Sequence, residues 1–216
     1  MGGRVCIMEF MRGKSHGSSQ VYDKVSGRRI DSSFYQAGQL EGVALVWDSL
    51  GNVVNRAEYH KDKPVGKSVR FFPGLKPAQF QNYDRRGREQ GLQEEWWPNG
   101  NKKNELMAKN GEIISGTEYY VTGKPRIRYA TKYDPGGSLM AMKTISQESW
   151  APDGRSAGTV VKGQGETLLF GNEASEIHVA AHREVYKDSL LVKLDELDSA
   201  ETLNWLDAYS KAHPSR

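Results

Sequence analysis

The chain of 216 residues contains 37% hydrophobic residues and carries a formal net charge of +3 at pH 7. No run reaches the roughly 18 apolar residues of a membrane-spanning helix, so we expect a soluble protein of one long domain or two small ones. The net charge is too small to indicate a nucleic-acid partner. Cys6 is the single cysteine, which excludes an intramolecular disulfide and a cysteine-based metal cluster.

A pattern of about 25 residues begins near the N-terminus and is repeated up to Tyr133. Each copy opens with a glycine, has an aromatic residue four or five positions later and a second glycine before a turn, and closes with a tyrosine about seventeen positions in. A fixed period of this length indicates a repeat architecture. The opening glycines are Gly17, Gly42, Gly66, Gly91 and Gly116. The aromatic positions are Tyr22, Trp47, Phe71, Trp96 and Tyr120. The closing positions are Phe34 with Tyr35 beside it, Tyr59, Tyr83, Ala108 and Tyr133.

Each copy predicts one β-hairpin, because an apolar and aromatic run ends in turn residues and is followed by a second run of β-formers. The turn residues are SLGN, PGLK, PNGN and TGKP in four successive copies. A lone hairpin is marginally stable in water, so each copy must pack on its neighbours. We therefore predict an all-β protein, an elongated antiparallel sheet of stacked hairpin repeats.

The segment 4–16 resembles the tail of an earlier copy, and VCIMEF in it predicts the first edge strand. Residues 13–17 read GKSHG, which matches the nucleophile elbow of hydrolases. That motif needs a helix after the serine, whereas a hairpin repeat follows here. The same residues hint at a phosphate loop, but Met8 stands where that motif requires its leading glycine. We interpret 13–17 as the polar connection between hairpins, and we predict no enzyme activity and no cofactor.

Beyond Tyr133 the repeat becomes degenerate. Residues 134–137, DPGG, predict the tip of a longer hairpin, and WAPDG at 150–154 repeats the turn of WPNG at 97–100. Two short strands are expected in 159–173, and one more hairpin from 176 onward. His178 and His182 have a spacing that could hold a metal from one face, but no motif supplies the further ligands that zinc needs. We assign them a structural or surface role and predict no metal.

The last element changes type. Asp198 and Glu201 have the spacing of a capping box, and the residues that follow have helical periodicity. The apolar face of this predicted helix consists of Leu203, Trp205, Leu206, Ala208 and Tyr209. It either covers the terminal edge of the sheet or docks a partner. The expected segments are 1–133 for the hairpin repeats, 134–197 for degenerate repeats that continue the sheet, and 198–213 for the capping helix.

The pattern G-x-x-x-x-W-x-x-x-G, with a tyrosine some eight residues later, resembles the MORN repeat in its bacterial variant form. The resemblance covers 17–133 well and the following hairpins loosely. The chain departs from the common eukaryotic form, which begins Y-x-G and contains more glycine. Proteins with the bacterial variant are often described as antitoxin components, and similar repeats occur in immunity proteins. The resemblance therefore implies a binding protein, without catalytic residues to carry over.

The residue after each repeated aromatic varies, and this variation points to a candidate site. It is Asp23, Asp48, Phe72, Trp97 and Val121 in the five copies. We interpret this position as facing away from the repeated aromatics, because side chains alternate along a strand, and as unexplained by the fold. Aromatic and charged residues near Phe72 and Trp97 would form a patch rich in binding hot spots. The candidate partner-binding residues are Arg70, Phe72, Arg85, Arg86, Arg88, Glu94, Glu95 and Trp97. Packing of Phe72 and Trp97 beneath the C-terminal hairpins or the helix is an equal alternative.

The resemblance predicts a bacterial immunity or antitoxin protein that binds a cognate protein toxin and occludes its active site. The alternative is a membrane-lipid-binding or scaffold module. The start, MGGRVCIMEF, lacks an apolar segment of signal-peptide length, so we expect a cytoplasmic protein from the sequence as given, or a periplasmic one if a signal peptide was removed. The oligomeric state and the identity of the toxin are left open.

Overall fold

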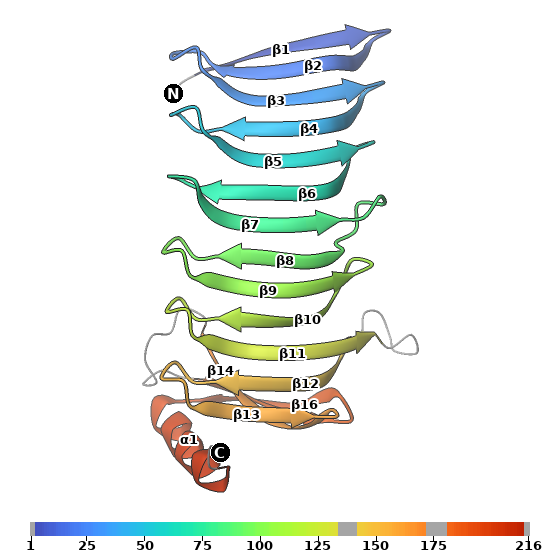
Figure 1. Ribbon diagram of the computed structural model, residues 1–216. Coiled ribbons are helices and arrows are strands. Elements are labelled where there is room, and N and C mark those ends of the chain that lie inside the picture. Colours follow the sequence, from blue (N-terminus) through green and yellow to red (C-terminus); the bar gives the residue numbers. More distant parts are fainter. Residues whose placement is uncertain (1–2, 134–141, 172–180, 214–216) are drawn as a thin grey trace. The chain divides into compact units, whose positions relative to one another are not determined.

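A computed structural model of the chain describes residues 3–133, 142–171 and 181–213. Within these ranges the chain forms sixteen β-strands and one α-helix, and the strands are ordered in the sheet as they are in the sequence (Figure 1). Paired strands are antiparallel, for example β1 with β2 and β4 with β5. The predicted fold class, antiparallel β-hairpins followed by a short C-terminal helix, is confirmed. The chain divides into two compact units, Met1–Gly100 with Ala108–Glu112, and Asn101–Met107 with Ile113–Arg216.

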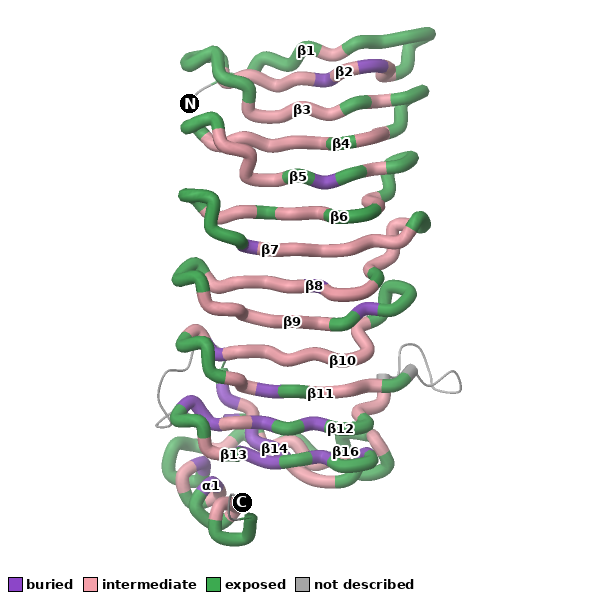
Figure 2. The backbone as a smooth tube through the Cα atoms, viewed as in Figure 1, coloured by how far each residue is buried: buried purple, intermediate pink, exposed green. Residues whose placement is uncertain are grey.

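The first unit is a sheet of single hairpins, and most of its side chains are half-buried or exposed (Figure 2). The buried hydrophobic side chains described in it are the small ones of Ala57, Ala78 and Ala108. Its strands are β1 (Arg4–Met11), β2 (Lys14–Asp23), β3 (Arg29–Gln36), β4 (Gln39–Trp47), β5 (Val53–His60), β6 (Lys63–Phe72), β7 (Lys76–Tyr83) and β8 (Gly91–Trp96). Strand β9 (Lys102–Lys109) has residues in both units.

Two kinds of turn alternate along the first unit. At one edge, two-residue turns such as Ala37-Gly38 and Lys61-Asp62 have positive φ at both residues, which is the type I′ geometry that matches strand twist. At the opposite edge, longer turns follow β2, β4 and β6. The connection between β1 and β2 is of the first kind and contains only Arg12 and Gly13. The interpretation of the whole segment 13–17 as a connection was therefore too broad, because its last four residues belong to β2.

The opening glycines Gly17, Gly42 and Gly66 each lie in a β-bulge. Between the pairs Ser32–Leu45 and Phe34–Glu41, one residue of β3 faces three residues of β4, and Gly42 is the first of these three. Its φ of +72° is strained for any residue with a Cβ atom. On the other side of β4, Gly42 pairs directly with Tyr59 of β5. Gly17, Gly42 and Gly66 thus each bend the strand on one side and face a tyrosine of the neighbouring strand on the other.

The same pairing corrects two predicted closing positions. Gly17 pairs with Tyr35, not with Phe34, and Phe34 is exposed on the other face. Gly116 pairs with Tyr129, not with Tyr133. Both assignments were wrong because the copies differ in length. The N–H of Asp23 bonds to the carbonyl of Arg28, whereas that of Asp48 bonds to the nearer carbonyl of Asn52, so the turn after β2 is longer; Gly116 in turn lies closer to its turn than Gly42 does.

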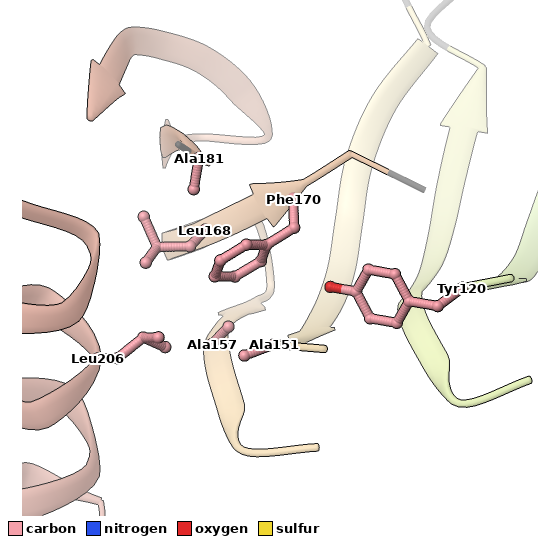
Figure 3. Packing of buried hydrophobic residues seen from close by; sticks show 7 residues of the cluster. All are labelled: Tyr120, Ala151, Ala157, Leu168, Phe170, Ala181 and Leu206. Carbon is pink, nitrogen blue, oxygen red and sulfur yellow. The ribbon is translucent and has the colours of Figure 1, made fainter. Parts of the chain in front are cut away.

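The second unit folds its sheet back on itself. Strand β14 contacts β11 and β12 in addition to its ladder neighbours. The strands are β10 (Glu112–Tyr119), β11 (Pro125–Tyr133), β12 (Met142–Trp150), β13 (Ser156–Val161), β14 (Gln164–Phe170), β15 (Ala181–Lys187) and β16 (Leu190–Leu197). The predicted turn at 134–137 lies outside the described residues. This folding encloses a hydrophobic core (Figure 3), whose buried members are Tyr120, Ala151, Ala157, Leu168, Phe170, Ala181 and Leu206.

The helix α1 (Ser199–Ala212) begins with the predicted capping box. The Asp198 carboxylate accepts hydrogen bonds from the backbone N–H groups of Ala200 and Glu201, and the Glu201 carboxylate accepts one from the Asp198 N–H. Leu206 and Thr202 are fully buried, and the helix contacts β13. It therefore packs on the core.

The helix also contacts the terminal strand β16, but it leaves much of that strand exposed. Leu190, Leu191, Val192 and Leu194 are each about half exposed, at 49%, 47%, 56% and 57%. A helix hides its apolar stripe most completely over a face that already contains large side chains, such as Leu168 and Phe170.

The Gly165 position should tolerate no side chain. It has a φ of +139°, and a Cβ atom there would lie 2.1 Å from the carbonyl oxygen of Thr159. We expect Gly165→Ala to lower the free energy of unfolding by about 3 kcal/mol, measured by urea denaturation. Gly154, with a φ of +99° and nothing within 4 Å of its Cβ position, is the matched control, and Gly154→Ala should cost only about 1 kcal/mol. Equal losses would contradict the close packing of β13 on β14.

Truncation of Leu206 tests whether the helix is part of the core. Because this side chain has no exposed surface, Leu206→Ala should lower the free energy of unfolding by about 3 kcal/mol. The exposed Asn204 of the same helix is the control, and Asn204→Ala should change it little. A Leu206→Ala loss below about 1 kcal/mol would mean that the helix is not packed on the sheet in solution.

Candidate binding surfaces of the first unit

The candidate residues Phe72 and Trp97 each open one of the longer turns. The N–H of Leu75 donates to the Phe72 carbonyl at 3.1 Å, and the N–H of Gly100 donates to the Trp97 carbonyl at 2.8 Å. In an earlier copy, the N–H of Gly51 donates to the Asp48 carbonyl at 3.1 Å. The variable position is therefore the residue that opens the turn. In two copies it is also the last residue of a strand, Asp23 of β2 and Phe72 of β6. The predicted reason for its variation, a place on the opposite face, leaves out this role in the turn.

The aspartates at this position are explained by the fold. One carboxylate oxygen of Asp48 accepts hydrogen bonds from the N–H groups of Leu50 and Asn52, both at 2.9 Å. Asp23 accepts one from the N–H of Ser26 at 2.7 Å in the same manner. Such carboxylate-to-backbone bonds replace a helix or ladder partner and make a turn rigid. Our interpretation that the variation was unexplained by the fold was thus wrong for these two copies.

Tyr120 occupies the turn position too, which shifts the predicted alignment of this copy by one residue. The N–H of Gly123 donates to the Tyr120 carbonyl at 2.8 Å, so Tyr119 corresponds to Trp47, and Tyr120 corresponds to Asp48. The Tyr120 ring is buried in the core of the second unit, and its hydroxyl donates to the Trp150 carbonyl at 2.5 Å. Burial raises the pKa of Tyr120 far above its ordinary value. The one turn position therefore serves as a solvent-exposed cap in one copy and as a core residue in another.

The tips of the longer turns carry exposed aliphatic residues that the sequence analysis missed. Val25, Leu50 and Leu75 are 83%, 78% and 49% exposed. They follow β2, β4 and β6, so they lie at the same edge as Phe72. We name these three residues together with Phe72 and Trp97 the turn edge. The regular interval of 25 residues between these three aliphatic residues could have identified them in the sequence. The sequence analysis considered only the glycines of the turns.

Three of the four candidate arginines lie at the opposite edge. Arg85, Arg86 and Arg88 belong to the connection between β7 and β8, whereas Phe72 and Trp97 lie at the far ends of the neighbouring strands. The eight residues of β7 span roughly 26 Å at the usual rise. Arg88 forms an ion pair with Asp84 at 2.7 Å. The structure thus separates the arginines from the aromatic candidates.

The remaining candidates lie on the faces of the sheet. Arg70 pairs with Gln79 and Gln79 pairs with Glu95, so these three share one face. Glu94 pairs with Phe80 and lies on the other. The eight predicted residues are therefore distributed over two edges and two faces, and they do not form one continuous patch.

The discounted motifs have a clear local structure. Ser15 lies in β2, and its hydroxyl donates to the Met8 sulfur at 3.4 Å, so the strand-turn-helix context of a nucleophile elbow is not formed there. His182 is exposed on β15, and His178 lies outside the described residues. Among the residues that the structure describes, no three His, Cys, Asp or Glu side chains gather to hold a metal ion. In the same part of the chain, no helix is long and apolar enough to cross a membrane.

A scan against protein-family models finds no match for this chain, and a search of curated proteins finds none either.

The capped turn of Asp48 should depend on pH. Its pKa lies below the ordinary value because the carboxylate accepts hydrogen bonds from the Asn52 side chain and then from backbone N–H groups. Because the pKa of Asp48 is lower in the folded chain than in the unfolded chain, the ionised carboxylate stabilises the fold. This stabilisation is complete above the unfolded-chain pKa of 3.8, and it declines as the pH falls through the lower pKa of the folded chain. Asp48→Asn keeps an acceptor oxygen for the turn, so its thermal midpoint should fall less than that of the wild type in acid.

The comparison needs only the difference between the two acid profiles, because other carboxylates contribute equally to both proteins. Asp48→Ala should lower the midpoint at neutral pH, since it removes the acceptor altogether. Parallel profiles for wild type and Asp48→Asn between about pH 6 and pH 2 would show that the carboxylate charge has no part in the turn.

Proposed function

We propose that this chain is a non-enzymatic protein-binding module and that the turn edge of the first unit is its main contact surface. The observation that supports this proposal is the row of exposed aliphatic tips, Val25, Leu50 and Leu75, on one edge beside Phe72 and Trp97. Scattered apolar residues are normal on a protein surface, whereas apolar residues gathered along one edge point to an interaction site. Aromatic residues next to such a row are the usual binding hot spots.

The rigidity of the turns favours this use. Asp23 and Asp48 hold their turns through hydrogen bonds to the backbone, and the Arg28 side chain donates to the Ser49 carbonyl of the next turn along the edge. Tips that are ordered before association lose little conformational entropy on binding. A rigid apolar edge can therefore bind tightly through a modest number of residues.

The resemblance to the bacterial variant of the MORN repeat extends the proposal to an immunity or antitoxin protein. Its partner would be a cognate protein toxin, and the simplest mechanism is occlusion of the toxin's active site or substrate entrance by the turn edge. No group of this chain takes part in chemistry under this mechanism. The separated arginines of the opposite edge, Arg85 and Arg86, would act through long-range attraction to an acidic partner.

A membrane-lipid-binding module is the second candidate, because aliphatic tips of this kind also enter the interface of a bilayer. The charges of the turns argue against it. Hydrogen bonds within the turns lower the pKa values of Asp23 and Asp48, so both carboxylates are ionised at neutral pH beside the tips. Their negative charge opposes the anionic surface that such modules usually bind.

The test is binding to the protein encoded beside this chain in its genome, measured by pull-down and then by titration calorimetry. Nanomolar affinity together with inhibition of the neighbour's activity is the expected result. Trp97→Ala should weaken binding by about 2 kcal/mol or more, and Leu50→Ser should weaken it measurably. Leu194→Ser, which changes an exposed leucine of β16, is the matched control and should have no effect.

Several results would count against the proposal. Equal affinities for Leu50→Ser and Leu194→Ser would remove the turn edge as the contact surface. Absence of binding to the neighbour combined with flotation on anionic liposomes, lost in Leu50→Ser, would replace the protein partner by a lipid surface.

A further inference from the structure

A shallow cavity of about 220 Å³ lies on the face of the first unit formed by β3, β4 and β5. We name it the sheet trough. Its floor is the pair Ala44 and Ala57, whose small side chains leave the space above them open. Tyr35 and Tyr59 line one end, and Asp31 and Asn55 line the other. The trough thus has an aromatic end, an apolar floor and a polar end.

The repeat explains why this hollow exists. Tyr35 and Tyr59 face the opening glycines Gly17 and Gly42 on the adjacent strands, so large rings alternate with positions that have no side chain. At the other end, the directly paired residues Asp31 and Val46, and Val46 and Asn55, bring a carboxylate and an amide to the two sides of one valine. The polar end is specific to these hairpins, because Arg70 and Gln79 take the corresponding places further along the face.

The Asp31 carboxylate is a partly buried charged group at the polar end of the trough. Partial burial raises its pKa, and the positive charge of Arg4 offsets part of this effect. Among the described residues, neither an ion pair nor a hydrogen bond connects to the Asp31 side chain, whereas Asp23, Asp48 and Asp84 all have such partners. A partly buried carboxylate without a partner is unfavourable until a donor reaches it.

We propose that the sheet trough binds an arginine side chain of the partner protein. The guanidinium would pair with the Asp31 carboxylate and the Asn55 side-chain oxygen, the methylene stem would lie on Ala44 and Ala57, and the tyrosines would contact the partner's adjoining backbone. This inference rests on the proposed protein-binding function. It adds a second contact surface, separate from the turn edge, and states its chemistry.

Arginine fits this surface better than lysine for two reasons. Its planar fork of donors matches a carboxylate and a second acceptor at once, and such charge-assisted bonds are stronger than neutral ones. The guanidinium is also more weakly hydrated than an ammonium group, so it loses less when it enters a half-buried site. The stem of either residue gains from the apolar floor.

The first experiment uses a small probe, so that it does not depend on finding the partner. N-acetyl-argininamide is titrated into the 15N-labelled full chain and backbone amide shifts are followed by NMR. We expect saturable shifts confined to β3, β4 and β5 at millimolar probe. The uncharged analogue N-acetyl-citrullinamide should give none. Asp31→Asn should weaken the probe about fivefold, while Asp48→Asn, which removes one carboxylate from a turn, should leave binding unchanged.

A second pair of variants tests the trough without removing its charge. Ala44→Arg places a guanidinium stem on the floor of the trough and should abolish the probe shifts. Val43→Arg puts the same side chain on the opposite, exposed face of the same strand and should bind the probe as the wild type does. The isolated chain provides an independent readout, because Asp31→Asn removes an unfavourable burial of charge and should raise the thermal midpoint at neutral pH.

The outcomes separate this inference from the proposed function. Shifts that are spread over the chain, absent, or equal for the arginine and citrulline probes overturn the trough as an arginine site, even if the neighbour protein binds tightly. Once a protein partner is in hand, Asp31→Asn and Ala44→Arg should each weaken it at least fivefold, and Val43→Arg should not. If the partner binds Ala44→Arg as tightly as wild type, the trough is not part of the interface.

Discussion

The pairing of an opening glycine with a tyrosine of the next strand, at Gly17, Gly42 and Gly66, is the constraint on which the hairpins of the first unit depend. Gly42 needs a positive φ because the strand bulges there against β3, and its missing side chain leaves room on the side where Tyr59 lies. An aromatic side chain opposite a glycine restores the packing that the glycine lacks. The bulge and the pair thus maintain each other, and they also determine where hollows form on the face of the sheet.

The two units show that the glycine–tyrosine pairs shape the strands but do not by themselves create a hydrophobic core. In the first unit the described buried hydrophobic residues are all alanines, so its stability comes from ladder hydrogen bonds, cross-strand pairs and capped turns. In the second unit the sheet folds back, and Phe170 and Leu168 of β14 bury Tyr120 and Ala151 at turn positions. Covering by a second layer, and not the repeat itself, therefore decides whether a turn residue is a cap or part of a core.

The sequence was sufficient for the hairpins, the turns and the capping box of Asp198, because these depend on local patterns. It failed for residues whose position depends on the length of the individual copy: Tyr35, Tyr129 and Tyr119 each lie off a simple count from the opening glycine. The candidate site failed as a single patch for a different reason. Trp97 and Arg85 are close in sequence, but a full strand separates them, so sequence distance is a poor measure of proximity in a hairpin.

In this repeat, some positions maintain the fold and other positions are available for recognition of a partner. The opening glycines and their tyrosines must stay as they are for the strands to bend and pack. The other positions can vary where no second layer covers them. They are the first turn residue, the turn tip and the polar end of each face. At the first turn residue, for example, an aspartate, a phenylalanine or a tryptophan closes the turn with the same backbone hydrogen bond. Asp31, whose side chain has neither a hydrogen bond nor an ion pair among the described residues, belongs to this second set. A partly buried carboxylate without such a partner is unfavourable until a donor reaches it, so a binding role explains this residue better than a folding role does.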